Sequence, residues 1–70
     1  MKVYLRHVRT RMYYSGWACW TSDPKHAFSF EKPEDAIQRA RSEMMSHLEM
    51  VIQEGNPVVE KVVPILEPKR

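Results

Sequence analysis

The chain has 70 residues, a formal net charge of +2 and a single cysteine. This length is enough for one domain, which we expect to span residues 1–70 with a frayed tail at 66–70. A single cysteine excludes an intrachain disulfide and, with no secretory leader, predicts a reducing compartment such as the cytoplasm. No apolar run approaches the roughly 20 residues of a transmembrane helix, so we expect no membrane partner.

Positive charge is concentrated near the start of the chain. Residues 1–22 contain four Lys or Arg residues and no acidic residue, whereas residues 23–70 contain seven Lys or Arg and nine Asp or Glu. A basic first segment favours a polyanion or an acidic partner. Charge on an edge strand also prevents aggregation, so a structural role explains the same residues.

Residues 3–14 are rich in valine, leucine and tyrosine, which favour strands. We expect two strands here with residues 9–11 in the loop between them, although the imperfect alternation also allows one continuous strand. The pair Ser15-Gly16 indicates a turn after this region.

Residues 17–21 form a second apolar and aromatic run. The odd spacing of Trp17 and Trp20 places them on opposite faces of a strand, so we expect one of them to be partly exposed. Asp23 is expected to cap a turn. A short strand is then expected over residues 27–30.

Residues 31–54 have the pattern of a single long helix. Pro33 suits the first helical position, and the two acidic residues after it lie at the positive end of the helix dipole. Apolar residues recur every three or four positions as far as Ile52. The sequence Gly55-Asn56-Pro57 then predicts the end of the helix.

The second half of this predicted helix is rich in methionine. Methionine fills irregular gaps in cores and also serves adaptable binding surfaces, so both interpretations stay open. A helix of about 33 Å is longer than strands of five to seven residues, so one end should project unless a second copy covers it. The candidate residues for protein binding or self-association are Met44, Met45, Leu48, Met50, Val51 and Ile52.

Residues 58–66 form the last predicted strand. Pro64 places this strand at an edge of the sheet, because proline cannot donate a ladder hydrogen bond. The resulting order is β-β-β-α-β. It predicts an α+β fold in which a small antiparallel sheet carries one long helix across one face.

No arrangement of residues indicates catalysis. The three histidines lie in different predicted elements and lack metal-ligand spacing. Cys19 has the pattern of a small buried hydrophobe with no base beside it. We therefore predict no enzyme activity, no cofactor, no metal and no small-molecule substrate.

Basic and aromatic residues are interleaved near the start of the chain. Aromatic rings on a sheet can stack on bases while arginines hold phosphates. So small a fold also needs its aromatic residues for the core. The candidate nucleic-acid contacts are Arg6, Arg9, Arg11, Tyr13 and Trp17.

One segment of the chain reads W-x-x-D-x-x-x-A-x-x-F and is followed by a helix start with an acidic residue before alanine. Over roughly residues 13–40 this pattern resembles a group of small uncharacterised bacterial and phage-type proteins. The group has no activity to carry over, so the resemblance implies a fold only. The structural roles that it implies are core positions for Trp20, Ala27 and Phe30, a turn cap for Asp23, and close approach of helix to sheet at Ala36.

A second, weaker similarity is to HicB-like antitoxin domains, whose small partial RNase-H-like fold has the same β-β-β-α-β order. Gly55-Asn56-Pro57, followed by two valines, resembles the exit from the helix in that family. This similarity implies an antitoxin role.

We therefore expect a non-enzymatic macromolecular-interaction module. Its first predicted role is that of a protein–protein adaptor, inhibitor or subunit that uses the sheet edge or the methionine-rich helix end. The alternatives are nucleic-acid binding through the basic N-terminal strands and a HicB-like antitoxin function.

Overall fold

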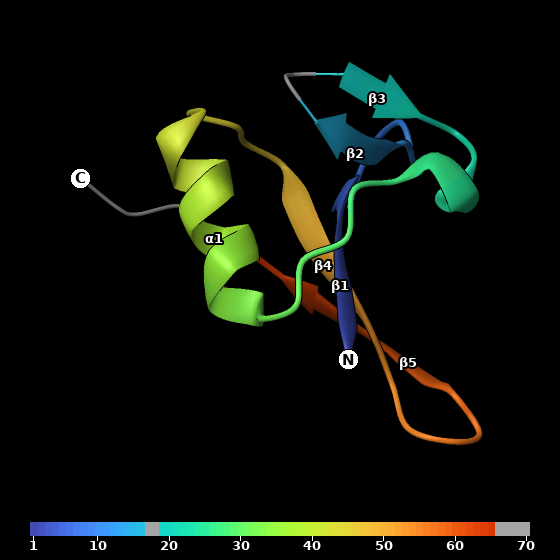
Figure 1. Ribbon diagram of the computed structural model, residues 1–70. Coiled ribbons are helices and arrows are strands. Elements are labelled where there is room, and N and C mark those ends of the chain that lie inside the picture. Colours follow the sequence, from blue (N-terminus) through green and yellow to red (C-terminus); the bar gives the residue numbers. More distant parts are fainter. Residues whose placement is uncertain (17–18, 66–70) are drawn as a thin grey trace.

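In the described residues, 1–16 and 19–65, five antiparallel strands form one sheet in the order β3-β2-β1-β4-β5. The computed structural model places one α-helix across one face of this sheet (Figure 1). The predicted α+β fold is confirmed at this level. The elements are β1 (Lys2–His7), β2 (Tyr13–Gly16), β3 (Cys19–Thr21), the 3-10 helix η1 (Pro24–His26), α1 (Pro33–Ser42), β4 (Leu48–Glu54) and β5 (Val59–Pro64).

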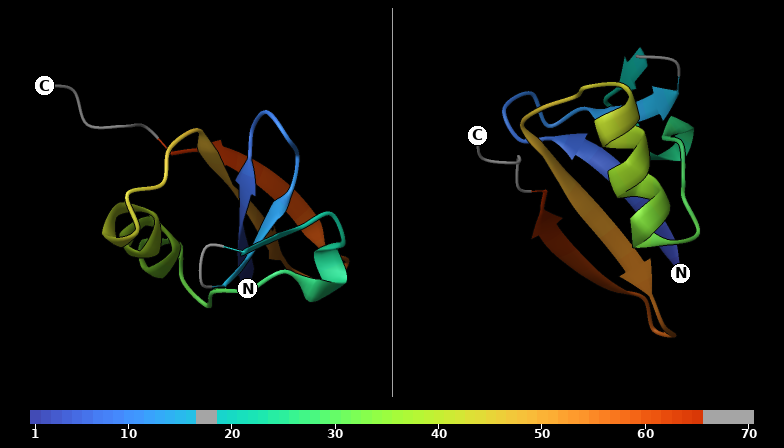
Figure 2. Two further views of the ribbon diagram at one scale, coloured as in Figure 1. Left: turned by 90° about the horizontal axis from the view of Figure 1, so that it is seen from above. Right: turned by 90° about the vertical axis from the view of Figure 1, so that its left-hand side faces the viewer.

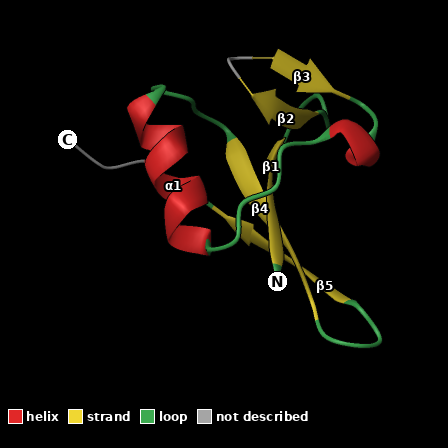
Figure 3. Ribbon diagram, viewed as in Figure 1, coloured by secondary structure: helices red, strands yellow, loops and turns green. Residues whose placement is uncertain are grey.

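The helix is much shorter than the sequence predicts. We expected it over residues 31–54, but α1 ends at Ser42 and the chain from Leu48 to Glu54 forms the strand β4. Figure 3 shows the loop that separates these two elements. The order along the chain is therefore β-β-β-α-β-β, and the predicted single long helix is wrong.

The start of α1 follows the expected pattern. Pro33 occupies the first turn, and both Glu34 and Asp35 lie there as well. Proline loses no hydrogen bond at this position, and the two carboxylates face the positive end of the helix dipole.

The end of α1 is a Schellman turn without glycine. The amide of Met45 donates to the carbonyl of Ala40 (2.9 Å), and the amide of Met44 donates to the carbonyl of Arg41 (3.1 Å). Met44 adopts the left-handed conformation that this turn requires, with φ of 54°. Its side chain is 90% exposed, whereas Met45 packs against the core. The chain therefore leaves the helix at Met44 and can return to the sheet.

The strand β4 occupies the middle of the sheet, between β1 and β5. Leu48, Met50 and Ile52 share the face that α1 covers, because they are in register with His7, Leu5 and Val3 of β1. Val51 faces the opposite side and is only 1% exposed. The consecutive residues Met50 and Val51 are therefore buried on opposite faces of the sheet.

The core lies between α1 and the sheet. Ala36 and Ala40 point at the sheet and are 0% and 2% exposed, so small side chains let the helix approach closely. Burial of Ala36 and of Phe30 confirms the expectation for both residues. The buried cluster consists of Val3, Leu5, Tyr14, Phe30, Ala36, Ala40, Leu48 and Met50.

The first predicted region is confirmed as two strands rather than one. A turn joins β1 to β2, and in it the amide of His7 donates to the carbonyl of Met12 and the amide of Arg11 donates to the carbonyl of His7, both at 2.9 Å. Arg11 takes a positive φ of 63°. It therefore occupies a position where glycine or asparagine is more usual.

The segment after η1 lies beside both β1 and β2. The amide of Phe28 donates to the carbonyl of Tyr14 (2.9 Å), and Phe30 exchanges two backbone hydrogen bonds with Val3 (2.7 and 2.8 Å). Only Phe30 forms a β-bridge, so the strand expected over residues 27–30 is reduced to one bridged residue. The rings of Phe28 and Phe30 are 4.9 Å apart, and both contact Tyr14.

Asp23 caps η1, because its carboxylate accepts a hydrogen bond from the amide of Lys25 (2.9 Å). This confirms its predicted role. Trp20 and Ala27 are half-buried, and Trp20 packs against the core. Trp17 and the tail at 66–70 lie outside the described residues.

One local prediction in this region is wrong, namely the burial of Cys19. Cys19 is exposed at the start of β3, which is an edge strand of the sheet. The predicted turn at Ser15-Gly16 fits the structure, because β2 ends at Gly16 and pairs antiparallel with β3, with Gly16 opposite Cys19. A register shift between Tyr14 and Gly16 marks a bulge at this end of β2.

The sequence Gly55-Asn56-Pro57 lies in the turn between β4 and β5, not at the exit from the helix. Gly55 adopts a φ of 90°, which glycine tolerates without strain. Figure 2 shows this hairpin extending beyond α1, and it contributes to a longest dimension of 40 Å. The segment that resembles the helix exit of HicB-like antitoxins is therefore a hairpin turn.

Candidate functional site

The strand β5 is exposed along its whole length, unlike the other four strands. All six of its residues are exposed. Its valines are Val59, Val62 and Val63, with exposed fractions of 54%, 47% and 39%, and Val58 just before it is 66% exposed. Figure 2 shows β5 at the outer edge of the sheet, with no described element beyond it.

The outer side of β5 carries backbone groups that the sheet does not use. The amide of Ile65 donates to the carbonyl of Leu48 on β4 (3.1 Å), so residue 65 faces inward. Because antiparallel ladders alternate, Glu60, Val62 and Pro64 direct their backbone groups away from β4. The missing N–H of Pro64 therefore costs no ladder bond, and the prediction that this strand lies at an edge is confirmed.

The predicted methionine-rich surface does not form. Leu48, Met50 and Val51 are buried in β4, and Ile52 and Met45 pack against the core. Met44 alone among these six candidates is exposed. The residues that sequence reasoning assigned to a helical contact surface instead build the interior of the sheet.

Two residues of the predicted basic and aromatic cluster, Arg6 and Tyr13, lie on the sheet face that α1 leaves open. Arg6 makes a short ion pair with Glu49, with both guanidinium contacts at 2.6 Å, and its carbon Cζ lies 5.8 Å from the centre of the Tyr13 ring. Burial acts to lower the pKa of Arg6, but its hydrogen bonds to Glu49 and Tyr13 outweigh this effect and raise the pKa. The charge of Arg6 is thus compensated by a neighbouring carboxylate.

The other two arginines of this cluster lie in the turn between β1 and β2. Arg11 is 3.8 Å from the carboxylate of Glu49, and its side chain is 70% exposed. Arg9 is exposed as well. The structure therefore brings Arg6, Arg11 and Tyr13 together around one carboxylate, which reduces the positive charge that the sequence suggested.

A hollow on the same open face was missed by the sequence reasoning. It has a volume of about 440 Å³. Alternation along β1 places Lys2 and Tyr4 on the same face as Arg6, a signal that was present in the sequence. Lys25 reaches the hollow from η1, which no local pattern predicts. The lining residues are Lys2, Tyr4, Tyr13, Pro24, Lys25, Ala27, Ser29 and Gln53.

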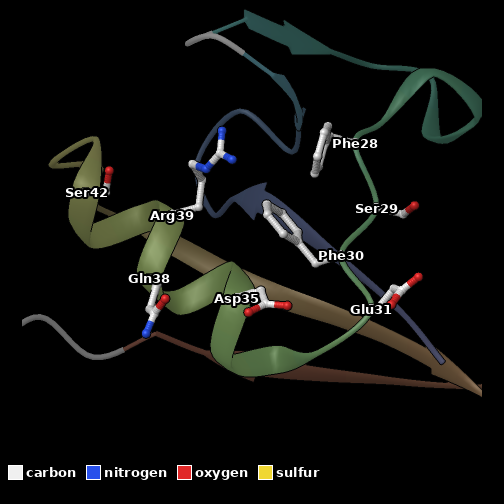
Figure 4. A pocket seen from close by; sticks show the side chains of 8 residues that line it. All are labelled: Phe28, Ser29, Phe30, Glu31, Asp35, Gln38, Arg39 and Ser42. Atoms are coloured by element: carbon white, nitrogen blue, oxygen red, sulfur yellow. The ribbon is translucent and has the colours of Figure 1, made fainter.

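A groove of about 520 Å³ lies between α1 and the segment that follows η1. Figure 4 shows Arg39 and Asp35 on the helix facing the rings of Phe28 and Phe30. The Arg39 guanidinium lies 5.9 Å from the centre of the Phe28 ring. The groove is completed by Ser29, Glu31, Gln38 and Ser42.

A hydrogen-bond network anchors α1 to β2 beside this groove. The Tyr14 hydroxyl donates to Glu43 (2.6 Å), and Arg39 donates to both Tyr14 and Glu43 (3.4 Å each). Burial, followed by the hydrogen bond to Glu43, raises the pKa of Tyr14. The network holds a neutral phenol in the core and ties helix to sheet, which is a structural task.

The described residues offer no assembled metal site. No group of three His, Cys, Asp or Glu residues among them is placed to hold a metal ion. The Nδ1 atom of His7 accepts from the amides of Arg9 and Thr10 (3.2 and 3.4 Å), so this nitrogen is used by the turn. No helix in the described part of the chain is long and apolar enough to cross a membrane.

Comparison of the chain with protein-family models, curated proteins and solved structures finds no match.

Proposed function

We propose that this chain is a protein-binding module that accepts an extended segment of another protein along β5. The partner segment becomes a sixth strand, and main-chain hydrogen bonds provide much of the attachment. The open edge of β5, with its exposed valines, is the observation that carries this proposal.

The edge is suited to this role by its backbone and its side chains. Glu60 and Val62 direct N–H and C=O groups outward, and an edge of this kind is a template for strand pairing. Valine side chains lie on both faces of β5, so an added strand gains apolar contacts above and below the sheet.

A second copy of β5 is a poorer occupant than a different protein. Two-fold antiparallel pairing centred on Glu60 or on Lys61 places like charges directly opposite each other, which is destabilising. Pairing centred on Val62 sets Glu60 opposite Pro64, which has no N–H to donate. These registers favour a partner strand with its own sequence.

The charges of β5 also define the partner. An antiparallel segment needs an acidic side chain opposite Lys61, a basic one opposite Glu60, and apolar ones opposite the flanking valines. The partner is therefore an extended segment in which an acidic and a basic residue stand side by side between apolar residues.

The test is affinity capture from host lysate, treated with nuclease, using the wild type and two edge variants. Val62→Pro removes an outward N–H without touching the ladder to β4, so a bound partner should be lost. Exchanging the two charges, with Glu60→Lys and Lys61→Glu together, keeps the net charge and should also weaken capture. Val62→Thr keeps the N–H and a branched side chain, so this control should retain the partner.

Equal capture of the same proteins by all four chains contradicts the proposal, provided that circular dichroism shows each variant folded. Recovery of nucleic acid in place of protein from untreated lysate would also contradict it. That outcome would favour the alternative of nucleic-acid binding, for which Arg9 is the arginine of the predicted set that lies outside ion-pair distance of Glu49.

A further inference from the structure

The hollow on the open sheet face has the charge of an anion site. Lys2 and Lys25 both line it, and no carboxylate does. Within the described residues neither lysine side chain takes part in an ion pair. Glu60, which is not among the lining residues, accepts a hydrogen bond from the side-chain amide of the lining residue Gln53 (3.0 Å). The lining of the hollow therefore contains two lysines without an ion-pair partner and no carboxylate.

The aromatic wall of the hollow is fixed in orientation. The rings of Tyr4 and Tyr13 meet edge to face, with centres 6.2 Å apart and an interplanar angle of 84°. Arg6 holds Tyr13 through its guanidinium, 5.8 Å from the ring centre, and is itself held by Glu49. Both tyrosines are half-buried, so each presents part of its ring while its position is set by packing.

We propose that this hollow binds a nucleotide, with the phosphate between Lys2 and Lys25 and the base against Tyr4 and Tyr13. Lysine binds phosphate as a point charge, and aromatic side chains bind bases by stacking without strict sequence preference. The volume of about 440 Å³ lies in the range of small-ligand sites. Ser29 and Gln53 add polar groups to the lining that can meet a sugar or a base edge.

This proposal is independent of the edge strand, because the hollow and the outer side of β5 use different residues. The same chemistry fits a free mononucleotide and one nucleotide of a single strand. Comparing AMP with a short oligoadenylate distinguishes these two sources, since a strand that uses further contacts binds more tightly than AMP.

The experiment is an amide NMR titration of the full chain with AMP, adenosine and inorganic phosphate. AMP should shift the amides of β1, Tyr13 and residues 24–29, and should bind more tightly than either of its parts. Lys25→Gln and Lys2→Gln should each weaken AMP binding by about threefold to tenfold, because each removes a charged contact. Lys25→Arg should retain most of the affinity.

The matched control is Lys32→Gln, which removes an exposed lysine at the start of α1, outside the lining of the hollow. It should leave AMP binding unchanged. The proposal is overturned if millimolar AMP shifts none of the lining amides, or if all three Lys→Gln variants lower the affinity equally. Shifts with inorganic phosphate alone that equal those with AMP would contradict the role of the two tyrosines.

Discussion

The two edges of the sheet are built differently. The edge at β3 is only three residues long, and it follows a bulge in β2. The edge at β5 is six residues long, regular in register and exposed throughout. Short strands and bulges protect an edge against further pairing, whereas a long regular edge invites it.

The β3 edge is also tied to the core by aromatic contacts. Trp20 packs edge to face on both Tyr14 and His7, with ring centres 5.9 Å apart in each pair. On β5 the protective features are limited to Glu60, Lys61 and the terminal Pro64. Aromatic contacts therefore hold the β3 edge against the core, whereas the described residues leave the outer side of β5 uncovered.

The largest expected difference is in how much a truncated side chain lowers stability in the inner strand β1 and in the edge strand β5. Leu5→Ala, at a fully buried position of β1, should lower the free energy of unfolding by about 2–5 kcal/mol through lost contacts and a cavity. Val62→Ala on β5 should have a much smaller effect, roughly 0.5 kcal/mol, because Val62 is already 47% exposed. Urea denaturation of both variants measures the contrast. Similar losses in the two variants would mean that β5 is covered in solution.

The attachment of α1 to β2 depends on the hydroxyl of Tyr14. Tyr14→Phe removes its hydrogen bond to Glu43 and should cost about 1.5 kcal/mol, the lower end for a bond to a charged group. The raised pKa of Tyr14 means that the unfolded chain releases this proton first, near pH 10. Stability is therefore fully present below about pH 10 and falls as the pH rises through it.

Denaturation at several pH values between 8 and 11 tests this dependence. The wild type and the control Tyr4→Phe should both lose stability at the alkaline end, whereas Tyr14→Phe should lose less. An identical alkaline loss in all three chains would show that another group is responsible.

A substitution in the turn between α1 and β4 is expected to change stability by a smaller amount and to raise it. Met44 is nearly fully exposed in a left-handed conformation, so Met44→Gly relieves backbone strain without losing burial. We expect about 0.5–1 kcal/mol of stabilisation, measured as a higher urea midpoint. Ser42→Gly, two residues earlier and inside the helix, should lower the midpoint. Destabilisation by both glycines would contradict the Schellman turn.

The smallest expected effect concerns the end of the open edge. Pro64→Val adds an outward N–H, so pairing between two copies centred on Val62 gains donors opposite Glu60. Light scattering should then detect weak self-association at high concentration, which Val63→Thr should not produce. A monomeric Pro64→Val variant at every concentration would show that the proline is not what limits self-pairing.

The sequence predicted the α+β class, the two first strands, the start of α1 and the edge position of β5. It failed at the end of the helix because a glycine-free turn at Met44 leaves no composition signal. The apolar residues after it also fit two periods. Leu48, Met50 and Ile52 alternate as in a strand, yet Leu48 and Ile52 also continue the four-residue spacing of Ala40 and Met44.

The functional surfaces were harder to predict than the fold. Each uses residues whose role depends on tertiary neighbours. From the sequence alone Arg6 is interpreted as an unpaired cation, because its partner Glu49 is 43 positions away. From the sequence alone Lys25 is interpreted as part of a turn, whereas in the fold it lines the same hollow as Lys2 and Tyr4 of β1.

The central claim is that the outer side of β5 is open and able to pair. Hydrogen exchange of its backbone amides tests this directly. Lys61 and Val63 should exchange slowly because their amides face β4, whereas Glu60 and Val62 should exchange rapidly in the isolated chain and become protected when the partner is bound. Equal protection of all four amides in the isolated chain would show that the edge is already covered, and would contradict the account.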